Sequence, residues 1–304
     1  MYESGMRYNS LNHYLVSKYN ERVFKIALNG GMTCPNRDGT LDDRGCIFCS
    51  RGGSGDHAAP LSESVTSQID NAITTLHKTK PGIRRFIAYF QAYTNTYAPV
   101  EYLERLFTEA IMHPDVVCLS IATRPDCLPA EVMELLKKLN NIKPVWVELG
   151  LQTIHEKTAD HIRRHYTLDV YDDAVIRLKN AGLTIITHVI IGLPGETETD
   201  MLKTIKHIIS LPLDGIKLQL LHVLKGTDLA DEINDIHILT LEEYTDIIIH
   251  CLEIIPEHVI IHRVTGDAPR KLLIAPEWSL NKHGVLNRIN HELKVRNTWQ
   301  GRLI

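Results

Sequence analysis

The sequence predicts an α/β protein built from consecutive parallel βα units, and three observations support this fold class. Short apolar runs rich in β-branched and aromatic residues recur along the chain, segments with helical spacing lie between them, and polar residues stand where the runs end. Six such runs within about 200 residues are too few for a closed eight-stranded barrel, which usually needs about 250 residues. An incomplete barrel and an open doubly wound sheet are both consistent with this count.

The six predicted strands are apolar and end next to a polar residue or a glycine. They are 23–29, 85–91, 116–123, 145–152, 184–192 and 215–223. Asn29, Gln91, Thr123, Gln152 and Gly192 stand at or just past the ends of five of them. In both architectures ligands bind at the carboxyl edge of the strands, so we expect a functional site beside these residues.

Helices are expected between the strands, where apolar residues recur three or four positions apart. The expected helices are 62–79, 99–112, 129–140, 155–164, 169–181 and 197–210. Pro99 and Pro129 stand near two expected starts, where a missing N–H costs little, and Gly182 stands just past an expected end. This punctuation agrees with the spacing.

The alternation weakens after residue 224. A helical stretch at 241–253, the apolar run HVIIHRV (258–264) and a basic helix-like segment at 282–296 follow. We therefore expect residues 1–224 to form the core and 225–304 to form a mostly helical extension packed on the sheet.

Composition and charge narrow the class of protein. The chain has 304 residues, of which 44% are apolar and 23% charged, as in soluble globular proteins. It lacks both an apolar run of about 18 residues and an apolar secretion signal, so we expect a cytoplasmic protein. Residues 257–304 carry a net charge of +4 and the remainder −8. This asymmetry indicates a polyanionic partner, although a solvated surface helix would explain it equally well.

Three of the six cysteines lie in one loop after the first strand. Cys34, Cys46 and Cys49 are separated by eleven residues and by two, whereas Cys118, Cys127 and Cys251 are isolated and are expected in the core. Without a secretion signal the clustered thiols favour metal or redox chemistry. A structural zinc ion would need a fourth ligand, for which His57 is available. Three thiolates on a [4Fe–4S] cluster would instead leave one iron open to a non-protein ligand.

This loop resembles that of the radical S-adenosylmethionine (radical SAM) enzymes, in which three cysteines follow the first strand of a partial (βα)6 barrel of the TIM type. Phe48, within the last cysteine pair, matches an aromatic residue common in the family. The wide cysteine spacing, CPNRDGT (34–40), YNSLNHYL (8–15) and TRPD (123–126) resemble the elongator-type branch and, within it, the small bacterial YtqA/YhcC-like group. The resemblance implies a [4Fe–4S] cluster and S-adenosylmethionine as cofactors.

Several residues acquire roles from this resemblance. The three clustered cysteines would bind the cluster, and Phe48 would lie against the adenine of S-adenosylmethionine. The segment that begins at Gly192 would approach the adenine edge. Glu148 and Gln152, on one face of the fourth strand, would contact the methionyl or ribose part. Arg163 would clamp the cofactor carboxylate, with Arg164 as the other candidate.

One segment departs from the family pattern. Many relatives carry a Gly-Gly-Glu type motif after the second strand, which receives the methionyl amino group, whereas this chain has YFQAYTNTY (89–97). Gln91, Tyr93, Thr94 and Asn95 would replace those contacts or face the substrate.

The resemblance also implies a reaction. Reductive cleavage of S-adenosylmethionine yields methionine and a 5′-deoxyadenosyl radical, which removes a hydrogen atom from an unactivated carbon. Flavodoxin or ferredoxin would supply the electron. The branch modifies the wobble uridine of tRNA, which implies conversion of a carboxymethylaminomethyl side chain at C5 to an aminomethyl one.

The basic tail is consistent with tRNA as the substrate, because cationic side chains can follow phosphates and Trp299 can stack on a base. The candidates are Arg263, Arg270, Lys271, Arg288, Lys294 and Arg296. The segment 262–270 is alternatively expected at the mouth of the active site. Two other functions remain open: a radical enzyme acting on a metabolite or protein, and a non-catalytic zinc or iron–sulfur module.

Overall fold

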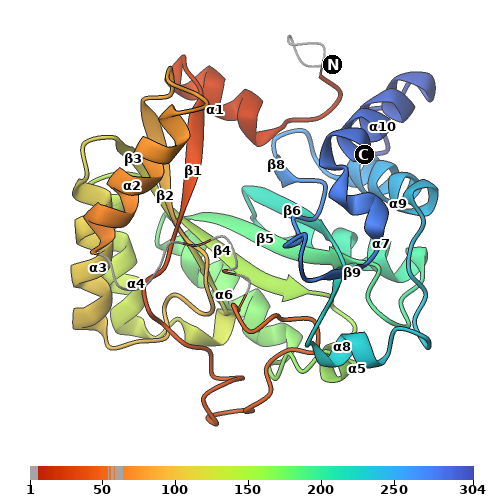
Figure 1. The fold of residues 1–304 in the computed structure, drawn as a ribbon, viewed down its shortest axis with the longest axis horizontal. Coiled ribbons are helices and arrows are strands. Elements are labelled where there is room, and N and C mark those ends of the chain that lie inside the picture. The colour runs from red at the N-terminus through yellow and green to blue at the C-terminus, as the bar shows by residue number, and fades with distance from the viewer. Residues whose placement is uncertain (1–5, 54, 56–57, 59–63) are drawn as a thin grey trace.

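A computed structural model describes residues 6–53, 55, 58 and 64–304. Its strands form a parallel sheet in the order β1-β2-β3-β4-β5-β6-β8, curled into a half barrel with helices on its outer side (Figure 1). The strands are β1 Val23–Leu28, β2 Arg85–Phe90, β3 Val116–Thr123, β4 Val145–Gln152, β5 Thr184–Ile191, β6 Gly215–Leu220 and β8 Ile260–Arg263. Six of them match the expected strands, which confirms the partial α/β barrel.

The seventh strand, β8, comes from the expected extension. It forms from the apolar run at 258–264 and pairs in parallel with β6. An unpaired edge of β6 would expose a row of backbone N–H and C=O groups, and β8 satisfies them. The sheet therefore continues beyond residue 224.

The helices agree with the expected segments and add two short ones, α1 near the N-terminus and α8 in the extension. They are α1 Leu11–Tyr19, α2 Val65–His77, α3 Val100–Met112, α4 Ala130–Asn140, α5 Glu156–His161, α6 Leu168–Asn180, α7 Glu198–Ile209, α8 Asp228–Asp231, α9 Leu241–Ile254 and α10 Lys282–Val295, with 3₁₀ turns η1 Pro125–Cys127 and η2 Glu277–Leu280. Pro99 and Pro129 cap α3 and α4 at their N-termini, and Gly182, at φ +73°, follows the end of α6 as expected.

The two faces of the sheet have different roles. The outer face packs against the surrounding helices in the main core, where Phe90 and Phe107 make an edge-to-face ring contact at 5.1 Å. The inner face is apolar only at its lower end, where Trp146 and its neighbours on β1, β2, β3 and β5 pack against Leu15 of α1. Helix α1 thus closes the N-terminal end of the half barrel, and the inner face is open to ligands towards the carboxyl ends of the strands.

The extension is tied to both ends of the chain. Helices α9 and α10 pack side by side, with α7 against α9, and the N- and C-terminal segments lie close together (Figure 1). The buried Gln300 accepts a hydrogen bond from Asn9 N at 2.8 Å and donates to Pro256 O and Val259 O. A small antiparallel pair, β7 Val223–Leu224 with β9 Leu273–Ala275, links the extension to the end of β6.

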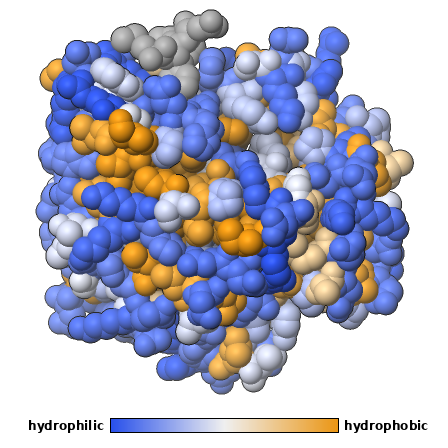
Figure 2. All heavy atoms as spheres, turned by 180° about the vertical axis from the view of Figure 1, so that it is seen from behind, coloured by the Kyte–Doolittle hydropathy of each residue, from blue (hydrophilic) through white to orange (hydrophobic). Residues whose placement is uncertain are grey.

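The surface is mainly hydrophilic on the face turned away from Figure 1, with apolar side chains gathered in a band across it (Figure 2). Among the described residues, no helix combines the length and the apolar character needed to cross a membrane.

The Phe90–Phe107 contact provides a test of the core. Phe107→Ala should lower the free energy of unfolding by about 3–5 kcal/mol, because it leaves a cavity between α3 and the sheet. Met112→Ala, in the same helix at a side chain 61% exposed, should change it by less than about 0.5 kcal/mol. Denaturant unfolding of both variants measures the difference, and equal effects would contradict this packing.

Candidate active site

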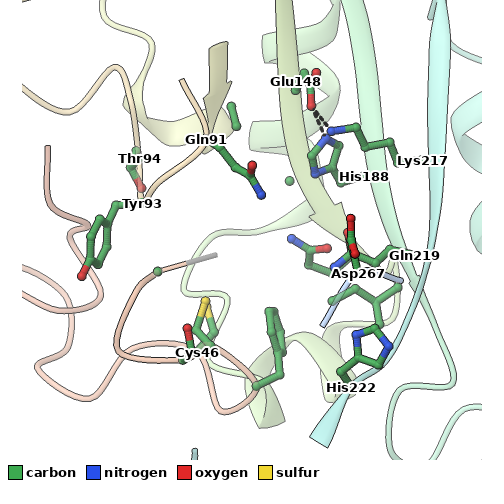
Figure 3. A pocket seen from close by; sticks show the side chains of 18 of the residues that line it. Cys46, Gln91, Tyr93, Thr94, Glu148, His188, Lys217, Gln219, His222 and Asp267 are labelled. Atoms are coloured by element: carbon green, nitrogen blue, oxygen red, sulfur yellow. Dashed lines mark hydrogen bonds and ion pairs between the residues drawn. The ribbon is translucent and has the colours of Figure 1, made fainter. Parts of the chain in front are cut away.

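A cavity of about 680 Å³ lies at the carboxyl ends of the strands, where the sequence placed the site. Its lining includes all three clustered cysteines, together with inward-facing residues of the strands and the segment 267–269. Figure 3 shows Cys46 on one side of this cavity and the group formed by Glu148, His188 and Lys217 on the opposite side. The sulfur atoms and the charged residues therefore share one space.

The cysteine loop is held by its own residues. Cys49 N donates to Cys46 O at 3.0 Å, and the Arg37 guanidinium donates to the carbonyls of Cys49 and Ser50 at 2.9 and 2.8 Å. Gly45 has φ +80°, and a Cβ there would lie 2.7 Å from Arg37 Nε. Glycine is needed at this position so that the arginine can cross the loop.

The three thiols are half-buried, and their surroundings suit bound metal better than free thiolate. Burial raises the pKa of Cys46 to about 12, and the neighbouring Cys49 and Cys34 act in the same direction. A positive metal centre would remove this penalty, because it stabilises the deprotonated ligand. Asn36 Nδ2 donates to Cys46 Sγ at 3.4 Å. Sulfur ligands of a metal commonly accept such hydrogen bonds from neighbouring residues.

Among the described residues no three His, Cys, Asp or Glu side chains converge as ligands of a single ion. His57, the expected fourth ligand of a zinc site, lies outside the described residues.

The segment after β2 supports the cysteine loop. Tyr93 N donates to Gly53 O at 2.8 Å, its hydroxyl donates to Arg51 O at 2.6 Å, and Thr94 N donates to Thr33 O at 3.1 Å. Asn95 is fully buried and donates to the carbonyls of Phe90 and Ala122. Gln91, Tyr93 and Thr94 line the cavity, and all three lie to the left of Glu148 and His188 in Figure 3.

The end of β4 brings two residues to the cavity. Gly150 and Gln152 both line it, with Gln152 at φ +69° next to an irregularity in the pairing with β5. A Cβ at position 150 would lie 2.9 Å from Gln152 Nε2. The glycine therefore makes room for the Gln152 amide over the strand.

Glu148, two residues lower on β4, is completely buried and accepts four hydrogen bonds. Its Oε1 accepts from Lys25 Nζ at 2.5 Å and Ser120 Oγ at 2.6 Å, and its Oε2 accepts from His188 Nε2 at 2.8 Å and from Lys217 Nζ. These donors come from β1, β3, β5 and β6. Because both oxygens are used within the protein, Glu148 organises the interior.

The charges of this group follow from burial and proximity. Burial alone would raise the pKa of Glu148, but Lys217 and Lys25 hold it well below its usual range. Burial lowers the pKa of Lys217 to about 7 against the opposing effect of Glu148, and lowers that of His188 to about 4. His188 therefore donates to the carboxylate as a neutral imidazole. The sequence analysis missed Lys25 and Lys217, although each is a lysine inside an otherwise apolar strand.

Other expected cofactor residues are placed differently. Phe48 lines the cavity, as expected, but Arg163 and Gly192 are not part of its lining. The Arg163 guanidinium donates to Gly45 O at 3.0 Å and pairs with Asp228. Its role as a carboxylate clamp stays a prediction that these contacts do not support. Arg164 lines the cavity, but its guanidinium donates to protein groups, including the carbonyl of Thr153 at 2.6 Å.

Gly192 lies at a turn, at φ +92°, and a Cβ there would lie 2.9 Å from Leu239. Its contact with adenine stays a prediction. The isolated Cys118, Cys127 and Cys251 are all buried.

The basic residues of the tail do not form one surface. Arg263 lines the cavity, and Arg270 and Lys271 are exposed just beyond the lining segment 267–269. The remaining three are exposed on or next to α10. Arg288 and Arg296 pair there with Glu292, and Arg296 also with Asp246. Trp299 lies under the guanidinium of Arg302 at 5.0 Å.

Comparison with known families agrees with this geometry. Residues 40–208 match the radical SAM superfamily, and residues 213–295 match the radical SAM C-terminal domain. The chain belongs to the radical SAM superfamily. Enzymes of this superfamily bind a [4Fe–4S] cluster and S-adenosylmethionine, and the cavity beside the three cysteines is of the kind they need.

Three relatives place this radical SAM protein more closely. It is 45% identical to YtqA of Bacillus subtilis over 97% of this chain and 92% of YtqA. It is 30% identical to the tRNA uridine(34) acetyltransferase of Methanocaldococcus jannaschii over 52% of this chain and 30% of that enzyme. The structure of archaeal Elp3 from Methanocaldococcus infernus has the same fold, with a TM-score of 0.69 and 18% identity over 91% of this chain and 64% of that one.

The buried carboxylate yields a stability test. Glu148→Gln should lower the free energy of unfolding by about 3–5 kcal/mol, because it leaves Lys25 and Lys217 without a counter-charge. Glu104→Gln, which breaks the exposed pair with Lys138, should cost less than about 1 kcal/mol. Adding Lys217→Met to the Glu148 variant should recover part of the loss.

The effect has a defined pH dependence. The folded-state pKa of Glu148 lies below the unfolded value of 4.5, so its stabilisation is present above pH 4.5 and is lost as the pH falls towards the folded value. The difference between wild type and Glu148→Gln should therefore narrow on acidification. A constant difference between neutral pH and the acid limb of the unfolding curve would contradict the assignment.

Proposed function

We propose that this radical SAM enzyme acts on tRNA and converts the carboxymethylaminomethyl side chain at C5 of the wobble uridine to an aminomethyl one. The observation that carries the proposal is that one cavity contains both the three cysteines and, across from them, a charged layer formed by Lys25, Glu148, His188 and Lys217. This cavity lies at the carboxyl ends of the strands. The similarity to the tRNA uridine(34) acetyltransferase supports a uridine in tRNA as the substrate.

Within this proposal Cys34, Cys46 and Cys49 hold the [4Fe–4S] cluster. Phe48 offers an apolar ring to the adenine, and Gly150 and Gln152 offer the strand end to the ribose or methionyl part. When bound, the two cofactors would supply a 5′-deoxyadenosyl radical that takes one hydrogen atom from the methylene of the carboxymethyl group. Loss of a second electron and hydrolysis of the resulting imine would release the carboxymethyl part as glyoxylate and leave the aminomethyl group, with S-adenosylmethionine as the net two-electron oxidant. Flavodoxin or ferredoxin is the proposed class of electron donor.

The residues of the chain orient the substrate and exclude water. The lower end of the inner face is filled by Trp146, and Leu15 of α1 packs there. Apolar side chains therefore occupy the N-terminal end of the inner face, opposite the cysteine loop. Glu148 fixes the position of the two lysines and His188, so that the interior keeps its shape when a ligand enters.

The tRNA contact is proposed for the basic residues outside the cavity. Arg270 and Lys271 are placed to meet phosphates near the flipped-out uridine, since they are exposed next to the cavity lining. Arg288, Lys294 and Arg296 would extend this contact along α10, although two of them are partly neutralised by Glu292.

The function is tested by the nucleosides of cellular tRNA. Cells without the protein should accumulate carboxymethylaminomethyluridine and lack aminomethyl derivatives, and the wild-type gene should reverse this. Cys46→Ala should fail to reverse it, whereas Cys118→Ala, a buried thiol outside the cysteine loop, should succeed. An unchanged nucleoside profile in the deletion strain would refute the proposed substrate.

The same two variants test the cluster directly. After anaerobic reconstitution, the Cys118→Ala protein should contain iron and inorganic sulfide like the wild type, and Cys46→Ala should have lost most of both. Elemental and sulfide analysis measures this without any activity assay. Equal cluster content in the two variants would remove Cys46 from the ligand set.

The basic residues differ in their expected effect on RNA binding. Arg270→Gln with Lys271→Gln should weaken tRNA binding and reduce the slope of log affinity against log salt by about 1–2. Arg288→Gln with Arg296→Gln should reduce this slope less, because both arginines already pair with acidic side chains of the protein. Binding measured across a salt series separates the two sets, and a larger loss from the α10 pair would reverse this order.

A further inference from the structure

The inner face of the sheet contains more cations than its single buried carboxylate can neutralise. Lys217 of β6 is in register with Arg263 of β8, and both line the cavity. Neighbouring strands lie about 4.8 Å apart, so two like charges in register repel each other unless an anion lies between them. Glu148 accepts from Lys217 and Lys25. Among the described residues, no carboxylate pairs with Arg263.

Asp267, the acid beside this region, lines the cavity and pairs with Lys282 at 2.9 Å, at the start of α10. On the same side, His222 Nε2 is buried and has no hydrogen-bond partner within the described part of the chain. Lys217 and Arg263 therefore present cationic hydrogen-bond donors to the cavity, and His222 lines it below Asp267 in Figure 3.

We propose that Arg263, together with Lys217, binds the carboxylate of the substrate's C5 side chain, an inference that rests on the proposed function. A guanidinium suits this role because its N–H groups match a carboxylate in two parallel hydrogen bonds. The bound carboxylate would supply a counter-charge for Arg263, which Glu148 does not contact. Arg263 and Lys217 are positioning residues, and they determine which side chain the site accepts.

S-adenosylmethionine also carries a carboxylate, and the geometry favours the substrate as its source. Within the proposed function its amino and carboxylate groups would bind the open iron, which would hold them beside the cysteines. Lys217 lies across the cavity from Cys46 (Figure 3). The distant cations are thus left for the second ligand.

The same charges distinguish substrate from product. The carboxymethylaminomethyl group contains an ammonium and a carboxylate and is neutral overall, whereas the aminomethyl product is a cation. Once the carboxylate has gone, Arg263 and Lys217 repel what remains. The site therefore favours entry of the substrate and release of the product.

The test compares two anticodon stem-loop RNAs that differ only in a carboxymethylaminomethyl or an aminomethyl group on the wobble uridine. They are bound to the anaerobic, cluster-loaded protein with S-adenosylmethionine but without reductant, so that no turnover occurs. The wild type should prefer the first RNA by about 10-fold or more, and Arg263→Gln should abolish most of this preference. Arg263→Lys should retain part of it.

A matched variant separates this effect from general RNA binding. Arg270→Gln, seven residues along the same segment, should weaken the binding of both RNAs equally and leave the ratio of their affinities unchanged. The folding of each variant is checked by its unfolding midpoint. Within the described part of the chain no ion pair of Arg263 is found, so its replacement should leave that midpoint close to the wild-type value.

The opposite outcomes are distinct. If Arg263→Gln keeps the preference, or lowers the affinity for S-adenosylmethionine instead, the assignment of this carboxylate site is wrong while the proposed function stands. If wild-type protein shows no preference although deletion cells accumulate carboxymethylaminomethyluridine, the carboxylate site is again overturned. If those cells have normal tRNA, the proposed function itself is refuted.

Discussion

The interior of the half barrel depends on one buried carboxylate. A charge in a fully buried position is costly unless donors surround it, and Glu148 receives donors from Lys25, Ser120, His188 and Lys217. The four donors come from four strands, so the carboxylate links much of the sheet across its inner face. Such a network fixes the distance between strands that are far apart in sequence, which a ligand cavity requires.

The network also separates two environments along the same strands. Below it, the inner face is apolar and is closed by α1 around Trp146. Above it, the strands end in glycine and amide side chains, such as Gly150 and Gln152, that leave room for a cofactor. Glu148, His188, Lys25 and Lys217 therefore line the cavity between its apolar N-terminal end and the cysteine loop.

The sequence was sufficient to predict the strands and the cysteine loop, because both depend on local patterns. Apolar runs give the strands to within three residues, and three cysteines in the loop after the first strand place three thiols at one edge of the sheet. Side-chain partners from distant segments could not be predicted in this way. Arg163 pairs with Asp228, 65 residues later, and Lys25 reaches Glu148 across 123 residues. A lysine inside an otherwise apolar strand was the feature of the sequence from which the Lys25–Glu148 pair could have been suspected.

The placement of β8 explains why the substrate end of the cavity belongs to the extension. A six-stranded half barrel would leave Lys217 at an open edge, where water would screen its charge. Pairing with β8 covers that edge and places Arg263 beside Lys217. The low polarity that results strengthens each electrostatic contact, and it makes an unbalanced cation pair more costly. The added strand thus places a second cation beside Lys217, across the cavity from Cys46, and a substrate carboxylate bound there would extend from these cations towards the cofactor.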